Sequence, residues 1–359
     1  MKQLAFLAVA TVGILLSTSC QQEDSMGELP GENGNASLTI LIKGDSGVGT
    51  RASETPSAPT QAEENEVKNL SIYIFNYVSG VLEREETLTS LPSDNKHITT
   101  GLSTTSQKRV VVLVNKPADL AINSYSDLSN SAKTVSLDTQ STYDLSSSST
   151  NGLFMSGEYG QAVTLNPTTT TEIQVSVKRL VAKVRLGKLT IPADATGFDL
   201  FSLSGVSVQK TRDKATVKQP SPAGSFGYVS GVTTTAFPSV KSYLNDVIAL
   251  PNGFAGGEVA DVANYFYVFP NDNTDDNYTL LTLAGSLDGG TTTTYYPFII
   301  NIDDPAYKIE SNKIYTLNVT LKKLTSGSDD PNEPYAEGSL EVEITVDNWE
   351  TELVQNVEW

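Results

Sequence analysis

Apolar and polar residues alternate along most of the chain beyond Val67, in short runs that turn-forming residues separate. The run from residue 340 to residue 346 is the clearest example, because every second residue is Leu, Val or Ile and those between are Glu or Thr. An alternation with a period of two is typical of a β-strand that has one face in a core and the other in water. The pattern therefore predicts antiparallel sheets.

Strands are predicted wherever such a run is bounded by Gly, Pro, Asn, Asp or Ser. The predicted strands are residues 37–43, 70–78, 110–115, 171–177, 179–191, 201–209, 265–270, 278–287, 295–302, 314–324 and 340–349. No long segment has the 3.6-residue period of an amphipathic helix. The sequence thus predicts an all-β fold made of antiparallel β-sandwiches.

Two stretches rich in Gly and Pro interrupt this pattern. Residues 44–66 are loaded with Gly, Ser, Pro and Glu, which cannot bury apolar surface, so an exposed loop is expected there. Gly187 and Pro192 lie between the two β-rich halves. Since 359 residues suffice for two domains, the predicted domains are residues 52–187 and residues 188–359.

The first twenty residues have the pattern of a secretion signal. Lys2 precedes an apolar run at residues 4–16, which is too short to span a membrane, and three small residues then precede Cys20. We interpret residues 1–20 as a lipoprotein signal peptide with the lipid attached to Cys20; the alternative is an incidental cysteine in an ordinary signal peptide. Either way the protein leaves the cytoplasm. The polar residues 21–35 are expected to be a tether.

Charge and composition narrow the function further. The chain has 24 Lys and Arg residues and 42 Asp and Glu residues, a net charge of −18, which repels phosphate backbones and excludes nucleic acid as a partner. It has one Cys and one His, so an internal disulfide, a Cys–His nucleophile pair and a His- or Cys-based metal site are excluded. Most classes of enzyme are thereby closed. The paired carboxylates of a secreted β-fold glycosidase stay open, but nothing in the sequence nominates such a pair, so we expect no enzyme and no cofactor.

Two weaker candidates for chemistry remain. His97 lies in a polar stretch, and an exposed histidine in a turn is favoured there over a catalytic base. The acidic residues 271–277 offer oxygen ligands for calcium, but they lack the spacing of a calcium loop, which favours a hairpin loop. No catalytic, cofactor-binding or metal-binding residue is assigned.

Several motifs in order along the chain carry a family resemblance. They are the leader ending at Cys20, the strand and Arg-bearing loop at 37–51, NLSIYIFNYVSGVLE at 69–83, LFMSGE at 153–158, VKRLVAKVRL at 177–186, YVFPND at 267–272, NKIYTLNVTLK at 312–322 and EVEITVDNWE at 341–350. Together they resemble the FimA/Mfa-like fimbrillins, the type V pilus subunits of Bacteroides-type bacteria. This resemblance implies two transthyretin-like β-sandwich domains, lipid-assisted export, trimming by an Arg-specific protease and polymerisation by strand exchange.

Carried onto this sequence, the resemblance implies cleavage between Arg51 and Ala52. Arg51 lies in a loop of Gly, Ser, Pro and Glu, the kind of exposed segment that proteases prefer. The cut would separate residues 21–51, a propeptide with Cys20 and its lipid, from the rest. The strand at 37–43 would leave with it, together with the apolar side chains of Leu38, Ile40 and Ile42.

Removal of this strand is expected to convert the monomer into a form that can polymerise. Burial of the three side chains contributes roughly 5–9 kcal/mol, less the cost of ordering, so the strand is expected to cover a sheet edge and an apolar groove until trimming. A neighbouring subunit then fills the groove by β-augmentation. The expected donor is the C-terminal tail, with its apolar residues Leu353, Val354, Val357 and Trp359.

The expected partners follow from this interpretation. They are identical pilin subunits, tip and anchor pilins, an Arg-specific protease, and the outer membrane that holds the lipidated precursor before the mature subunit enters an extracellular fimbrium. Two alternatives stay open: a surface-anchored glycan-binding lipoprotein that keeps Cys20, and a tip adhesin of the same pilus. The apolar tail favours a stalk subunit, because a stalk subunit has to donate a strand onward.

Overall fold

Nearly all regular structure in the described part of the chain is β-strand. The computed structural model describes residues 36–44, 64–141, 152–192, 194–195, 200–218, 226–247, 257–260, 264–272, 277–302, 304–323, 327–334 and 340–348. The helical elements in these residues are short: η1 (Tyr125–Ser129), α2 (Leu137–Ser141) and η2 (Ser242–Leu244). None of them has the length and hydrophobicity needed to cross a membrane. The prediction of an all-β fold is confirmed.

The first half of the chain forms one seven-stranded sheet. Its order is β3 (Leu82–Leu88), β2 (Leu70–Asn76), β5 (Lys108–Val114), β7 (Met155–Glu158), β8 (Thr171–Arg179), β1 (Ala36–Gly44) and β4 (Lys96–Leu102). All pairs are antiparallel except β1 with β8, which run parallel. β3 and β4, the two outermost strands, are rich in polar residues and were not predicted from the alternation.

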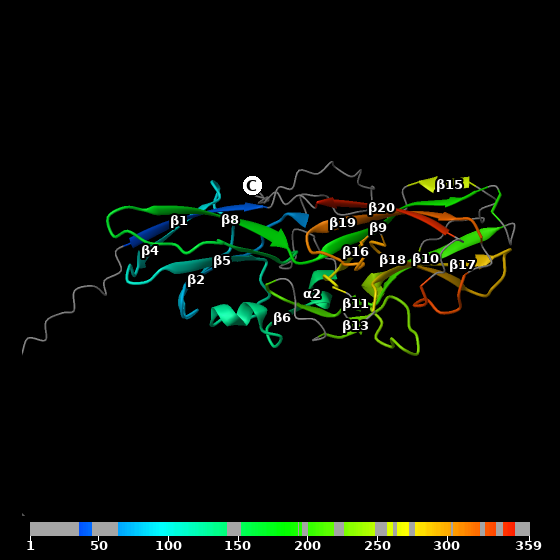
Figure 1. Cartoon of the computed structure of the whole chain (residues 1–359), viewed down its shortest axis with the longest axis horizontal. Coiled ribbons are helices and arrows are strands. Elements are labelled where there is room, and N and C mark those ends of the chain that lie inside the picture. Colours follow the sequence, from blue (N-terminus) through cyan, green and yellow to red (C-terminus); the bar gives the residue numbers. More distant parts are fainter. Residues whose placement is uncertain are drawn as a thin grey trace, which may run out of the picture.

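This sheet folds over on itself to enclose a core. One hydrophobic cluster contains Ile40 of β1 and Val175 of β8 together with Ile72 of β2 and Val112 of β5, so the two ends of the sheet face each other. Figure 1 shows β1 and β8 lying over β5 and β2. The corner is at β7, where Gly157 approaches β8 so closely that a Cβ would lie 2.2 Å from the Ser176 carbonyl oxygen. The first half is thus a β-sandwich made from one folded sheet.

Two further sheets form the second half. The order of the first is β14 (Asn245–Asp246), β10 (Phe201–Gln209), β17 (Leu280–Leu287) and β18 (Thr294–Ile299). The order of the second is β15 (Gly257–Ala260), β9 (Ala182–Ile191), β19 (Lys313–Leu321) and β20 (Leu340–Asn348), with β16 (Phe266–Val268) also paired to β9. Leu186 of β9 and Leu283 of β17 belong to the same buried cluster, so these sheets share a core.

The chain passes from the first sheet to the second half between Arg179, the end of β8, and Ala182, the start of β9. The boundary predicted at 187/188 therefore falls inside β9, whose partners all come from the second half. The halves also share a small ladder, since β6 (Thr134–Ser136) pairs with β12 (Lys214–Thr216). A further short pair, β11 (Thr211–Arg212) with β13 (Tyr228–Val229), completes the second half.

Candidate functional site: β1 and the junction beside it

The apolar face of β1 is completely buried. Leu38, Ile40 and Ile42 are each 0% exposed, and they belong to the cluster between the two layers of the first sheet. The alternation in the sequence produces this directly, because residues two apart on a strand point to the same side. On the other side Lys43 is exposed. The predicted strand and its buried face are therefore present in the structure, one residue longer at each end than predicted.

β1 lies between two strands. Its backbone pairs in parallel with β8 from Leu38 opposite Thr171 to Gly44 opposite Val177, and antiparallel with β4 on its other side. The expectation that this strand covers one sheet edge needs correction, because β1 is an inner strand with a ladder on both sides. We call the position between β8 and β4 that β1 occupies the β1 slot. Loss of β1 would leave two unpaired edges and an apolar strip between them.

Both ends of the segment 45–63 lie at the same place in the fold. Gly44, before it, is opposite Val177 in β8, and Asn65, after it, accepts a hydrogen bond from Nη2 of Arg179, two residues further along β8. Arg51 and Ala52 belong to this segment and lie outside the described residues, as do Cys20 and the tail residues Leu353, Val354, Val357 and Trp359. Their predicted roles stay predictions.

A buried ionic cluster holds Glu64, the first described residue after the segment 45–63. Lys183 Nζ donates to Glu64 Oε1 at 2.9 Å, and the Tyr267 hydroxyl donates to the same oxygen. Glu64 is 1% exposed and Lys183 2%. Oppositely charged groups at such depth stabilise each other only as a pair, because an uncompensated charge there is very costly. The first described residues after the segment 45–63 are thereby bound to β9 and β16 of the second half.

Arg179 extends this cluster to the end of β8. Its guanidinium is 1% exposed and donates to Asn65 and, from Nη1 at 3.5 Å, to Asn312 Oδ1. Burial lowers the pKa of Arg179 to about 10, and the nearby Glu64 carboxylate opposes that shift. The group therefore stays cationic at neutral pH. Local periodicity in the sequence does not indicate these contacts, because Glu64 and Asn65 lie more than 100 residues from Lys183 and Arg179.

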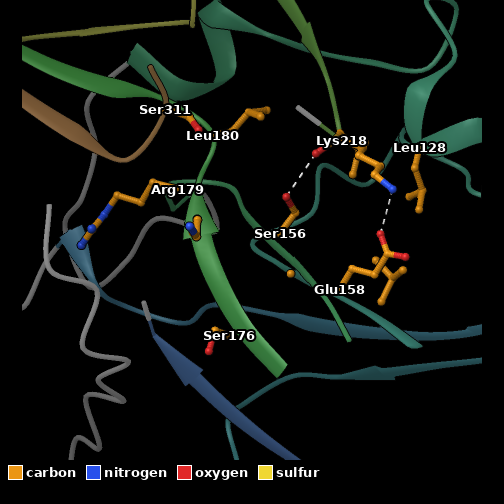
Figure 2. A pocket seen from close by; sticks show the side chains of 12 residues that line it. Leu128, Ser156, Glu158, Ser176, Arg179, Leu180, Lys218 and Ser311 are labelled. Carbon is orange, nitrogen blue, oxygen red and sulfur yellow. Dashed lines mark hydrogen bonds and ion pairs between the residues drawn. The ribbon is translucent and has the colours of Figure 1, made fainter. Parts of the chain in front are cut away.

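A pocket of about 260 Å³ lies beside Arg179 at the junction of the two halves. Its lining comes from β5, η1, β7, β8 and the residue after it, the residues after β12 and the turn before β19: Val111, Leu128, Ser156, Gly157, Glu158, Ser176, Lys178, Arg179, Leu180, Val217, Lys218 and Ser311. Figure 2 shows the Lys218 ammonium pointing at the Glu158 carboxylate, 3.0 Å away, and the Arg179 side chain directed away from that pair. Ser156 Oγ donates to the Val217 carbonyl at 3.1 Å. These contacts join the first half of the chain to the second, which is a structural role.

The other residues considered from the sequence are not part of this site. His97 was expected in an exposed turn, and that is wrong: it lies in β4, with a side chain 18% exposed and paired with Glu86 of β3. Asn271, at the start of the acidic stretch, is buried and donates to the Asn277 carbonyl at 2.8 Å. Within the described ranges, no group of three or more His, Cys, Asp or Glu side chains is placed to hold a metal ion.

Residues in the first half of the chain match the model of a known protein family. Residues 36–187 match the family model of the major fimbrial subunit protein FimA. This part of the chain is similar to the FimA family. No curated protein matches the chain. The resemblance to FimA/Mfa-like fimbrillins seen in the sequence is thus confirmed, and the matched family is that of a major fimbrial subunit.

Solved structures extend the likeness to about nine tenths of the chain. A crystal structure described as a candidate cell adhesion protein from Bacteroides eggerthii has a TM-score of 0.65 and 24% identity, covering 90% of this chain and 98% of that one. The fimbrilin FimA of Porphyromonas gingivalis has a TM-score of 0.65 and 18% identity, covering 89% and 98%. A candidate cell adhesion protein from Parabacteroides distasonis has a TM-score of 0.60 and 17% identity, covering 88% and 98%. At these identities the likeness shows a shared β-sandwich fold.

Proposed function

We propose that this protein is a structural subunit of a fimbrium in which β1 is a removable strand, and that the vacated β1 slot receives a strand from a neighbouring copy. The observation that supports this best is the double pairing of β1, whose three apolar side chains are fully buried. An empty slot would offer hydrogen-bonding edges on both sides and an apolar floor. Such an edge recruits a strand from another chain by β-augmentation.

The route to an empty slot begins with cleavage. In this proposal Cys20 carries the lipid of an outer-membrane precursor, and an Arg-specific protease cuts between Arg51 and Ala52 on the cell surface. The position of the segment 45–63 supports this order of events, since both of its ends lie beside the end of β8. A cut within it separates β1 from the rest of the chain without breaking any other strand. The buried pair of Glu64 and Lys183 then keeps the new N-terminal region attached to the second half.

The donor in this proposal is the C-terminal tail, residues 351–359. It follows β20, the outermost strand of its sheet among the described strands. The apolar residues Leu353, Val354, Val357 and Trp359 would enter the β1 slot of the next copy. One slot and one donor per subunit make a head-to-tail interface that does not close, so a filament grows. A subunit with both features belongs in the stalk, beside tip and anchor proteins of the same fimbrium.

The cleavage step is tested by Arg51→Lys, which keeps the positive charge but removes the residue that an Arg-specific protease requires. We expect this variant to reach the surface with Cys20 lipidated and to stay monomeric, as measured by intact mass and electron microscopy. Lys214→Ala, at an exposed position of β12, is the matched control and should be trimmed and polymerise. Fibres from the Arg51 variant would refute the cleavage step. A native protein that begins at lipidated Cys20 would favour the glycan-binding lipoprotein instead.

The donor step is tested separately by deletion of residues 351–359. We expect folded, trimmed monomers that still pair with an added synthetic peptide of the tail sequence. Continued growth of fibres from the deleted protein would show that another segment is the donor, without affecting the result on Arg51.

A further inference from the structure

Strand β4 has a single backbone partner. Among the described strands it pairs only with β1, from Ala36 opposite Leu102 to Leu41 opposite Lys96. Its other edge does not form a ladder. A slot between β8 and β4 has two walls only if β4 stays in place, yet the departure of β1 removes every ladder that β4 makes. Something else must then hold β4.

Side-chain contacts join β4 to β3, and these two strands lie at opposite ends of the folded sheet. The Glu86 carboxylate of β3 contacts two residues of β4: its Oε2 is bonded to His97 Nε2 and accepts a hydrogen bond from the Thr99 hydroxyl at 3.2 Å. Arg84, also of β3, donates from Nη2 to the Thr100 carbonyl at 3.4 Å. We call these contacts the β3–β4 seam.

Glu86 is the centre of the seam because it is the member that contacts two β4 side chains. It is held in turn by Arg84, whose Nε lies 3.9 Å from Glu86 Oε1. The side chains of His97 and Glu86 are 18% and 24% exposed, and Thr99 is 1% exposed. Hydrogen bonds to a carboxylate are stronger than those between neutral groups, and partial burial strengthens them further.

We propose that Glu86 is a positioning residue that keeps β4 at the far wall of the β1 slot when β1 is absent. This inference rests on the proposed function, because it concerns the form from which β1 has left. With β4 held, the slot keeps the width of one strand, roughly 9–10 Å between its two walls. An incoming strand then forms hydrogen bonds on both sides at once. With β4 released, the same strand meets only the edge of β8.

Hydrogen exchange in the intact chain tests the seam without cleavage. In Glu86→Ala, we expect the amides of residues 96–102 to exchange about tenfold faster, while those of β2 and β5 keep their protection. Glu86→Gln, which can still accept a hydrogen bond from Thr99, should recover part of the protection. Asp119→Asn, an exposed carboxylate in the loop after β5, is the control and should change nothing. Unchanged exchange in β4 of Glu86→Ala would overturn the proposal.

The affinity of the β1 slot for a peptide of the β1 sequence tests the role of Glu86 in that slot. The chain is cleaved in its 45–63 segment, freed of β1, and titrated with a labelled synthetic peptide of residues 36–44. We expect Glu86→Ala to bind this peptide at least about tenfold more weakly than the original protein or Asp119→Asn, with little change in the urea midpoint of the second half. Equal affinities would overturn the role of Glu86 alone. An original protein that never releases β1, or never rebinds it, would instead overturn the proposed function.

Discussion

Strands β1 and β9 occupy equivalent positions in their sheets but differ in what ties them to the molecule. Each is an inner strand with a parallel partner on one side, β8 for β1 and β19 for β9, and antiparallel partners on the other. Each buries its apolar face. β9, however, continues directly from β8 and carries Lys183, which is bound to buried Glu64. The covalent connection from β1 to the rest of the described chain runs through the segment 45–63 alone.

The cores of the two strands differ in the same way. The side chains of β1 belong to the smaller cluster inside the first sheet, whereas those of β9 belong to the cluster that runs through both halves. In the proposed function, β1 leaves without opening the rest of the molecule, because its apolar residues contact only the smaller cluster. In that proposal burial alone does not decide whether a strand is permanent, and covalent continuity and buried charge distinguish β9 from β1.

The largest effect is expected from the charge that holds β9. Lys183→Met removes the cation that is hydrogen-bonded to the buried Glu64 carboxylate and leaves Arg179 as its nearby cation, which should lower the free energy of unfolding by about 3–5 kcal/mol in urea titrations. The double variant Glu64→Gln with Lys183→Met also removes the carboxylate charge and should recover part of that loss. A single variant as stable as the original protein would show that the ionic cluster does not distinguish β9 from β1.

A matched pair of core truncations compares the two strands directly. Ile40→Ala in β1 and Leu186→Ala in β9 each remove a fully buried side chain and should each cost about 2–5 kcal/mol in the intact chain. After cleavage and loss of β1, only the Leu186 variant should still be less stable than its parent in urea. If Ile40→Ala also remained destabilised after that treatment, β1 would not have left.

The smallest effect is expected from the ion pair between Asp138 of α2 and Lys241. Burial raises the pKa of Asp138, but hydrogen bonds from Lys241 and Tyr243 outweigh it, so the pKa lies below its ordinary value. Because the folded pKa is depressed, the stabilisation is present above the ordinary pKa near 3.9 and is lost as pH falls through the folded value. Exposed ion pairs contribute at most about 1 kcal/mol, so Asp138→Asn should lower Tm by at most about 2–4 °C at pH 7.

The pH dependence provides the check on that prediction. The difference in Tm between the original protein and Asp138→Asn should shrink as the pH is lowered through the acid range, whereas Asp119→Asn should show no such trend. A difference that stayed constant from pH 7 to pH 3 would mean that the carboxylate charge is not what Asp138 contributes.

Alternation in the sequence located the strands that have one dry face. The strand predicted at 201–209 is β10 to the residue, and the one at 340–349 is β20 but for its last position. β3 and β4 were missed because these two outermost strands carry polar residues on both faces, as the charged run of β3 does, and so lack the apolar period. The seam at Glu86 and His97 was missed with them.

The amino-acid sequence by itself determined the class of this protein: an all-β, acidic, fimbrillin-like chain with a short apolar strand ahead of a Gly- and Pro-rich segment. Those features depend on residue type and on neighbours within a few positions. The tertiary structure alone decided that β1 lies between β8 and β4, that Glu64 meets Lys183, and that Glu86 joins the two ends of the folded sheet. The first two pairings involve residues far apart in the chain, and local periodicity contains no information about which distant strand will supply the partner. Glu86 and His97 are only 11 residues apart, but they lie on strands that lack an apolar period.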